Sequence, residues 1–259
     1  MQAALNRVRN RVLAGARLRK GMTVLDVGAG TGLLALDAGR RVGEAGCVVA
    51  LDVSHDALME CQRRRQPSDP LRVVVGDAVS LPLPDECADA VVARSVLIYV
   101  VDKAGAATEF HRVLRPGGRV SIFEPINMQY EWFAEVDLSD LEPARSRVVE
   151  RWQTGGDPGG AMRGFDERDL MRHFAGAGFE SVELTQEVSS RRTRARTQEV
   201  AVFLTVRPNP NMISYEEAAR VVLGDDADKH LETLATALTS RPSTSVRAGA
   251  FLRCRRARR

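Results

Sequence analysis

The chain has 259 residues, of which 44% are hydrophobic and 27% charged. This composition is typical of a folded globular protein and excludes disorder for the chain as a whole. Lysine and arginine total 37 and aspartate and glutamate 34, so the net charge is only +3 and the chain is no polycation. Only Lys20, Lys103 and Lys229 are lysines, which leaves few candidates for a lysine-dependent mechanism.

Hydrophobic runs are short, because arginine or an acid interrupts each of them well before the roughly 18–20 apolar residues that a membrane span needs. We therefore expect no membrane span and a cytoplasmic location. Four cysteines (Cys47, Cys61, Cys87 and Cys254) lie far apart and form no Cys-x-x-Cys pair. This spacing predicts no metal site and suits a reduced intracellular setting.

The first 25 residues contain five arginines and no acid, as organellar presequences can. They lack serine, however, and lead directly into a core strand. We therefore interpret residues 1–20 as an N-terminal helix, packed by Leu5, Val8 and Val12 at helical spacing.

From residue 22 onward, β-branched runs alternate with helical segments, which indicates βαβ units on a parallel sheet. The last helix should stop at Pro116-Gly117-Gly118, a strong breaker. Five strands with crossover helices make a doubly wound domain, which we place at residues 21–124. The expected strands are residues 23–27, 47–53, 72–75, 88–93 and 119–123, and the helices 31–42, 55–65 and 102–114.

The alternation ends after Glu124. Residues 125–165, which include Tyr130, Trp132, Phe133 and Trp152 and a glycine-rich run, should form a cap or lid segment. Residues 166–191 should form a core helix at 166–177 and a sixth strand at 181–188. Residues 192–240 should form a helical cap insertion over the pocket, broken at Pro208 and Pro210. Residues 241–259 should form a closing strand at 246–254 and a basic tail.

A glycine loop follows the first strand, in Asp26-Val27-Gly28-Ala29-Gly30-Thr31-Gly32, and leads into a helix. Backbone N–H groups and glycine clearance let a ligand approach such a loop closely. The dinucleotide fingerprint would place its third glycine at position 33, which is leucine here, so a nicotinamide dehydrogenase is disfavoured.

Three acids stand at the ends of consecutive strands. Asp26 ends the first, where a negative charge would oppose a pyrophosphate but attract an ammonium group. Asp52 ends the second and could accept hydrogen bonds from both hydroxyls of a ribose. Asp77 follows the third and could accept from an exocyclic amine. One such acid could simply cap a turn, but three beside a glycine loop indicate a ligand with a cationic part.

The glycine loop, the segments that contain Asp52 and Asp77, and Leu114-Arg115-Pro116-Gly117-Gly118 follow one another along the chain. Together they resemble the successive motifs of the class I S-adenosylmethionine-dependent methyltransferases, in the broad small-molecule group. The resemblance covers about residues 20–125. It implies a Rossmann-like sheet of seven strands, the last antiparallel, and S-adenosylmethionine as cofactor. The residues it assigns to the cofactor are Asp26, Gly28, Ala29, Gly30, Gly32, Asp52, Val53, Asp77, Ala78, Arg94 and Ser95.

The acceptor is less constrained. After the fourth strand the chain reads Arg94-Ser95-Val96-Leu97 instead of the Pro-Pro-Tyr type of motif, which disfavours methylation of planar amino groups. The scarcity of lysine disfavours ribose 2′-O methylation, and arsenic methylation would need several convergent thiols. We therefore expect transfer to O or N of a small organic acceptor by in-line displacement.

Residues after the fourth and later strands should face the acceptor. Glu124 could act as a base or orient a donor, or it could anchor a loop; Tyr99 could line the site or belong to the core. Asn127, Tyr130 and Trp132 are the candidates for acceptor binding, in a cap whose aromatics could instead pack on the core.

Arginine runs at residues 63–65, 191–196 and 253–259 could bind nucleic acid. The small net charge and the absence of interleaved aromatics favour solvated faces and a frayed terminus instead. An RNA methyltransferase and a catalytically silent cofactor-binding regulator are the alternatives to a small-molecule enzyme. The sequence does not predict the oligomeric state.

Overall fold

The computed structural model describes residues 2–134, 136–154, 160–162, 164–207 and 212–258, and the side chains of residues 132–134 lie outside the description. The chain divides into two compact units. Unit 1 comprises Met1–Ile126, Phe165–Glu187 and Gly249–Arg259, and unit 2 comprises Asn127–Gly164 and Val188–Ala248.

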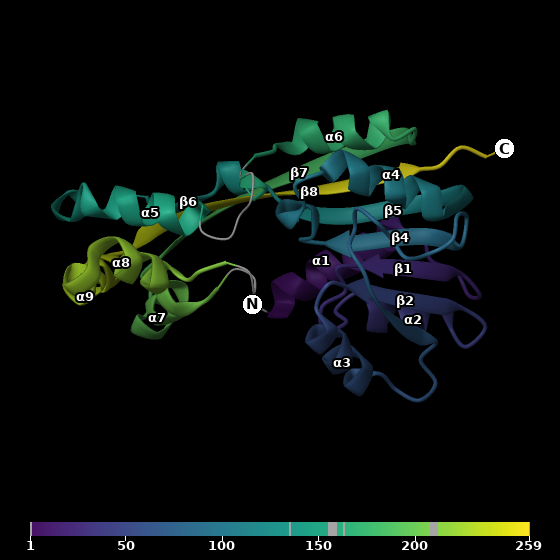
Figure 1. The fold of residues 1–259 in the computed structure, drawn as a ribbon, viewed down its shortest axis with the longest axis horizontal. Helices are drawn as coiled ribbons and strands as arrows, with labels where there is room; N and C mark the ends of the chain where they lie inside the picture. Colours follow the sequence, from purple (N-terminus) through teal and green to yellow (C-terminus); the bar gives the residue numbers. More distant parts are fainter. Residues whose placement is uncertain (1, 135, 155–159, 163, 208–211, 259) are drawn as a thin grey trace. The chain divides into compact units, whose positions relative to one another are not determined.

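Unit 1 is built on a doubly wound sheet with the strand order β3-β2-β1-β4-β5-β8, and β7 pairs with β8 (Figure 1). The first five strands are parallel and β8 is antiparallel to β5. This confirms the expected Rossmann-like sheet of seven strands, the last antiparallel. The strands are β1 (Thr23–Val27), β2 (Cys47–Asp52), β3 (Leu71–Val75), β4 (Ala88–Arg94), β5 (Leu114–Pro125), β7 (Glu180–Thr193) and β8 (Ser243–Arg255).

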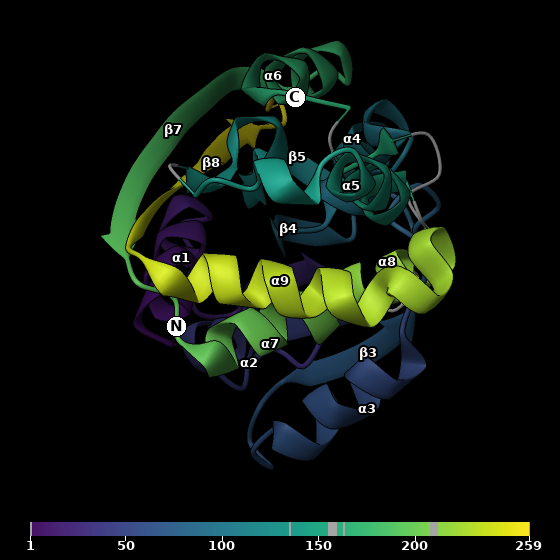
Figure 2. The same ribbon diagram turned by 90° about the vertical axis from the view of Figure 1, so that its left-hand side faces the viewer.

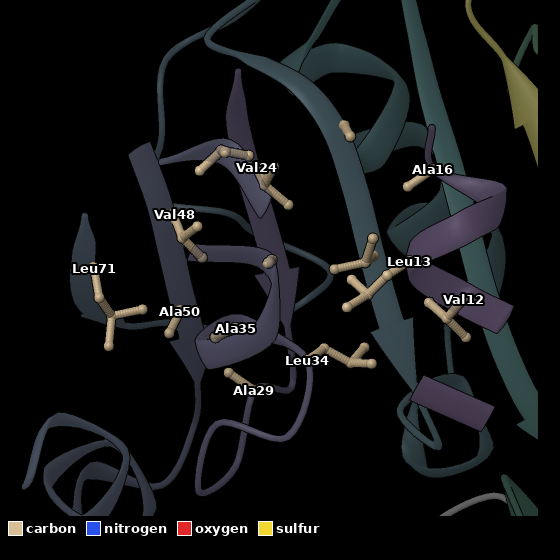
Figure 3. Close-up of a cluster of buried hydrophobic side chains, with 14 of the residues drawn as sticks. Val12, Leu13, Ala16, Val24, Ala29, Leu34, Ala35, Val48, Ala50 and Leu71 are labelled. Carbon is tan, nitrogen blue, oxygen red and sulfur yellow. The ribbon is translucent and has the colours of Figure 1, made fainter. Parts of the chain in front are cut away.

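Helices cover both faces of this sheet. On one face, α1 (Gln2–Gly15), α2 (Ala35–Val42) and α3 (His55–Arg64) pack their apolar residues on β1, β2 and β4. Figure 3 shows part of this cluster, with Val12 and Leu13 on α1, Ala35 on α2, and Val24 and Val48 on the strands. On the other face lie α4 (Lys103–Val113) and α6 (Glu167–Gly176), which meet through Phe110 and Phe174, whose ring centroids are 6.2 Å apart.

Three expectations about local structure were wrong. The helix predicted from residue 31 begins at Ala35, because glycines in left-handed conformations hold the preceding residues in turns. The strand predicted from residue 119 begins at Leu114, so Pro116-Gly117-Gly118 lies inside β5; the helix predicted at residues 102–114 does end before this breaker, at Val113. The basic tail is not frayed: Arg256 donates to Leu114 O (2.5 Å) and to Glu86 Oε1 (2.8 Å).

Unit 2 has its own apolar core, formed by helices that Figure 2 shows together. At its centre the Trp152 ring packs edge-on against Phe203 and Tyr215, each with a centroid distance of 5.7 Å. The short strand β6 pairs with the start of β8 and adds an eighth strand. The elements are β6 (Glu131–Ala134), α5 (Ala144–Thr154), α7 (Thr197–Thr205), α8 (Tyr215–Leu223) and α9 (Ala227–Ser240).

Short 3-10 turns connect the main elements in both units. The prolines 208 and 210, expected to break the helical region, and most of the glycine-rich run, residues 155–159, lie outside the described residues. Among the helices in the described ranges, none combines the length and apolarity that crossing a membrane would require. The turns are η1 (Leu97–Tyr99), η2 (Asn127–Gln129), η3 (Ser139–Leu141) and η5 (Gly224–Asp226).

Candidate functional site

The glycine loop connects the end of β1 to α2 and is fastened to β2. The N–H of Ala29 donates to Leu51 O (2.9 Å), and the N–H of Gly30 donates to Asp52 Oδ2 (2.8 Å). Gly28 and Gly30 both have positive φ angles, +65° and +52°, in the left-handed region that glycine adopts without penalty. The loop therefore has a fixed path across the carboxyl edge of the sheet.

The space beside the loop differs from glycine to glycine. A Cβ atom at Gly28 would lie 2.3 Å from Val96 Cγ2, and one at Gly32 would lie 2.6 Å from Cys61 Sγ. A Cβ at Gly30 would meet nothing within 4 Å. The outer glycines thus let protein parts pack tightly, whereas the middle glycine borders open space into which a ligand can fit.

Asp26 lies beneath this loop and is buried, with only 1% of its surface exposed. Neither carboxylate oxygen has a hydrogen-bond partner among the described residues. Burial raises the pKa of Asp26 to about 8, and the nearby charge of Asp52 adds to the rise; the Ala35 N–H and the Arg94 guanidinium act in the opposite direction. A buried carboxylate with no partner is costly, and a cationic ligand would remove much of that cost.

Asp52 ends β2 and already holds two backbone groups. In addition to Gly30, the N–H of Ser54 donates to its Oδ1 (2.9 Å). Each carboxylate oxygen can accept a further hydrogen bond, so a vicinal diol could still bind here. The next residue, Val53, is 66% exposed, an unusual position for an apolar side chain that offers a contact surface for a planar group.

Asp77 and Ala78 form a tight turn after β3. The carboxylate of Asp77 is exposed and accepts a hydrogen bond from the N–H of Val79 (3.1 Å), and its carbonyl accepts from Ser80 (3.2 Å). Ala78 is buried. The turn thus contributes a polar edge and a small apolar residue.

The segment after β4 carries Arg94 and Ser95. Ser95 has a φ of +56°, uncommon for a residue with a side chain, and its N–H donates to Phe123 O (2.8 Å). Arg94 lies close enough to Asp26 to lower the pKa of that carboxyl. Val96 then packs against Gly28, a contact that no sequence pattern indicated.

Glu124 at the end of β5 is fully buried and fastens the segment after β4. Its Oε1 accepts from the N–H groups of Val96 (3.0 Å) and Leu97 (3.1 Å), and its Oε2 accepts from Ile98 (3.1 Å). Burial raises the pKa of Glu124 to about 7, and the three N–H donors oppose the rise. These contacts support the anchoring alternative over the role of a base that meets the acceptor.

Two further side chains of unit 1 lie near this segment. Tyr99, in η1, is 37% exposed, so it does not belong to the core. Lys103, one of the three lysines, is buried at 5% exposure; its Nζ donates to Val100 O (2.8 Å) and lies 4.5 Å from the centre of the Phe165 ring. No pattern in the sequence indicated that this lysine would be buried.

The three candidates for acceptor binding belong to unit 2. Asn127 and Tyr130 are half-buried in and after η2, and the N–H of Tyr130 donates to Asn127 O (3.2 Å). Burial raises the pKa of Tyr130, while the charge of Arg247 lowers it. The Trp132 side chain lies outside the described part of the chain, so its role stays a prediction.

The carboxyl edge of the sheet in unit 1 therefore brings together a buried carboxylate without a partner, an open glycine loop and a second carboxylate with spare acceptor capacity. These groups are chemically suited to a nucleoside-like ligand that carries positive charge. They fit S-adenosylmethionine, which combines a ribose, an adenine, an ammonium group and a sulfonium.

Comparisons with known proteins agree with this class. A family model described as "Methyltransferase domain" matches residues 25–122. The ubiquinone/menaquinone biosynthesis C-methyltransferase UbiE of Escherichia coli O1:K1 / APEC is 35% identical over 177 residues, which are 64% of this chain and 69% of that protein. The first relatives found are matched over less of their length: 36% of an uncharacterized transposon protein of Streptomyces fradiae and 56% of UbiE from Bordetella avium.

Among solved structures, a putative methyltransferase from Bacillus halodurans has a TM-score of 0.61 at 20% identity, covering 96% of this chain and 98% of the other. YcgJ from Bacillus subtilis has a TM-score of 0.63 at 16% identity, covering 98% and 100%. Identities this low support the fold alone. With the sequence relatives, they show that the chain belongs to the class I S-adenosylmethionine-dependent methyltransferases. It is an enzyme that uses S-adenosylmethionine as its cofactor.

Proposed function

We propose that this methyltransferase acts on a small organic acceptor. The observation that carries the proposal is the likeness to relatives about 35% identical that are named C-methyltransferases of ubiquinone and menaquinone biosynthesis. Its cofactor part rests on Asp26, a buried carboxylate with no hydrogen bond among the described residues, next to the open space at Gly30. Within the proposal, Asp26 balances the cationic methionine part of the cofactor, because opposite charges attract strongly where water is excluded.

The other cofactor contacts follow from position. Asp52 accepts hydrogen bonds from the ribose hydroxyls while it holds Gly30 in place. Val53 packs on the adenine, whose exocyclic amine donates to Asp77, and Ala78 provides room for the ring.

On the methionine side, the loop residues Gly28, Ala29 and Gly32 keep the backbone close to the cofactor. Arg94 and Ser95 line the same side, held by the Glu124 anchor.

The atom of the acceptor that receives the methyl group could be carbon, oxygen or nitrogen. The sequence favours O or N, but relatives that are about 35% identical are named C-methyltransferases of ubiquinone and menaquinone biosynthesis. We therefore propose a carbon atom of an electron-rich small molecule as the methyl acceptor. Transfer to O or N of the same kind of molecule is the competing outcome.

S-adenosylmethionine, when bound, supplies a methyl group already activated by a positively charged sulfur. The chain must hold the acceptor in line with that methyl and keep water out. We propose that Glu124 contributes as a positioning residue, since its two oxygens are engaged by three backbone N–H groups. Tyr99, Asn127, Tyr130 and Trp132 remain the predicted acceptor-side residues.

The test is a labelled-methyl assay with the full chain and S-adenosylmethionine, against a panel of quinone precursors, phenols and amines and a mixed RNA pool. Mass spectrometry locates the label, and NMR distinguishes a C-methyl from an O- or N-methyl product. We expect a C-methylated small molecule, and no product with Asp52→Ala as the matched control. Label found only in RNA would contradict the proposal, and an O- or N-methyl product would refute the choice of carbon.

A further inference from the structure

One cavity of unit 1 lies away from the glycine loop. A cavity of about 220 Å³ sits between the end of α1 and strands β5, β7 and β8. It lies near the start of the paired part of β5, where Arg119 is opposite Ala90, whereas the glycine loop follows the end of β1. Its lining includes Arg17, Arg119, Arg253, Arg255, Ser181 and Glu183.

The charges around this cavity do not balance. Arg253 pairs with Glu183 (2.5 Å), and Arg255 reaches Glu180 (3.4 Å). Arg17 and Arg119 have no acidic partner among the residues that the structure describes. Four guanidinium groups thus face two carboxylates, which leaves a local surplus of positive charge.

The strand register places two of these arginines side by side. Arg119 of β5 and Arg255 of β8 are direct partners in the antiparallel pair, so their side chains project from the same face of the sheet. Like charges in this arrangement destabilise a sheet. Burial and the charges of Arg17 and Arg255 lower the pKa of Arg119. The Nε of Arg255 is also buried and has no hydrogen-bond partner in the described ranges.

The backbone around the cavity is unusual as well. Arg17 and Ser181, which both line it, have φ angles of +52°. Residues with side chains seldom adopt this left-handed conformation, and such residues cluster at functional sites. Two unfavourable backbone conformations and a pair of facing arginines therefore occur around the same cavity. Neither feature stabilises the fold.

We propose that this cavity binds the phosphate group of a small phosphorylated molecule. Guanidinium groups pair with phosphate oxygens through two parallel hydrogen bonds, so a phosphate would relieve the repulsion between Arg119 and Arg255. The cavity is smaller than the roughly 300 Å³ at which sites for whole drug-sized ligands begin, and it suits a phosphate or pyrophosphate group.

A small ligand fits this cavity better than nucleic acid does. Glu180 and Glu183 lie beside the arginines and would repel a continuous phosphate backbone. No aromatic side chain lines the cavity to stack with bases.

Calorimetry and thermal unfolding of the full chain with inorganic phosphate, pyrophosphate and ADP test the site. We expect saturable binding and a rise in Tm with ligand. Arg119→Gln should raise the Tm without ligand, because it removes the like-charge contact, yet weaken pyrophosphate binding by about tenfold or more. Glu183→Gln should tighten binding, because it removes a nearby negative charge.

Arg63→Gln is the matched control, since Arg63 is an exposed arginine of α3 that pairs with Glu60. It should leave pyrophosphate affinity unchanged, and all variants should keep their affinity for S-adenosylmethionine, which separates this site from the methyltransferase site. Equal losses in Arg63→Gln and Arg119→Gln would reduce the effect to overall charge and overturn the proposal. So would the absence of saturable binding of all three ligands, or binding of an RNA oligonucleotide without binding of pyrophosphate.

Discussion

Two glycines of the same loop should respond differently to one added methyl group. Gly28 and Gly30 both have positive φ angles, so alanine at either site costs about 1–2 kcal/mol in backbone energy. At Gly28 the new Cβ also overlaps Val96 Cγ2 at 2.3 Å, which adds about 1–3 kcal/mol of overpacking. At Gly30 it meets nothing.

Gly28→Ala should therefore destabilise the ligand-free enzyme by about 2–5 kcal/mol and Gly30→Ala by only about 1–2 kcal/mol. For S-adenosylmethionine binding the order should be reversed, with the larger loss of affinity in Gly30→Ala. Gly30→Ala fills the space proposed for the cofactor and should weaken binding by about tenfold or more, which corresponds to about 1.4 kcal/mol.

Urea unfolding measures the stability of each variant, and calorimetry measures cofactor affinity. A double-mutant cycle with Val96→Ala isolates the overlap: it should recover about 1–3 kcal/mol in the Gly28→Ala background, because the removed methyls make room for the Cβ. The reasoning is refuted if Gly30→Ala is as unstable as Gly28→Ala, or if Val96→Ala gives no recovery. Unchanged cofactor affinity in Gly30→Ala would refute the assignment of the open space.

Three further changes test the two carboxylates of the site and the anchor of the segment after β4. The raised pKa of Asp26 means that the folded enzyme keeps a proton which the unfolded chain releases, so the contribution of Asp26 to ligand-free stability should fall from about pH 4 to about pH 8, by at most about 1.4 kcal/mol per pH unit. Asp26→Asn should flatten this slope in urea unfolding and weaken cofactor binding; an unchanged slope would contradict the burial argument. Asp52→Ala should lower both cofactor affinity and stability, and the stability loss should be about 1–3 kcal/mol because two backbone N–H groups lose their acceptor. Calorimetry measures the affinity and urea unfolding measures the stability; a change in only one of the two would disprove this prediction. Glu124→Gln turns one acceptor into a donor that faces an N–H group, so cofactor affinity should fall with turnover; if turnover alone fell, with affinity unchanged and a shifted pH profile, Glu124 would be a base after all.

Most of the sheet could be predicted from sequence, because β-branched runs between breakers have few alternatives. The strand at residues 23–27 was predicted with the bounds that the structure has, and the one at 47–53 was one residue too long. Errors arose where tertiary contacts override local signals. Pro116-Gly117-Gly118 looks like a terminator, yet it lies within β5, where Gly117 and Gly118 form backbone hydrogen bonds with residues 256–257, which follow β8.

The site was predictable by residue type but not by partner. That Val96 packs on Gly28 depends on how the segment after β4 folds back, which leaves no periodic signal in the sequence. The same is true of the tail: Arg256 reads as part of a charge run, but its guanidinium donates to three backbone carbonyls and to Glu86. Contacts between distant segments, rather than composition, decide these roles.

Asp26 and Glu124 illustrate the limit most clearly. Each is an acid at the end of an apolar strand of one sheet, and each is almost completely buried. The pKa of each is raised by burial, to about 8 for Asp26 and to about 7 for Glu124. Only the partners differ: three backbone N–H groups donate to the oxygens of Glu124, whereas those of Asp26 form no hydrogen bond of normal geometry among the described residues, although the Ala35 N–H is near enough to lower its pKa. A charge that the fold itself satisfies stabilises a loop, and one that the fold leaves without a partner is available to a ligand. The assignment of one acid to positioning and the other to cofactor binding therefore rests on their hydrogen bonds.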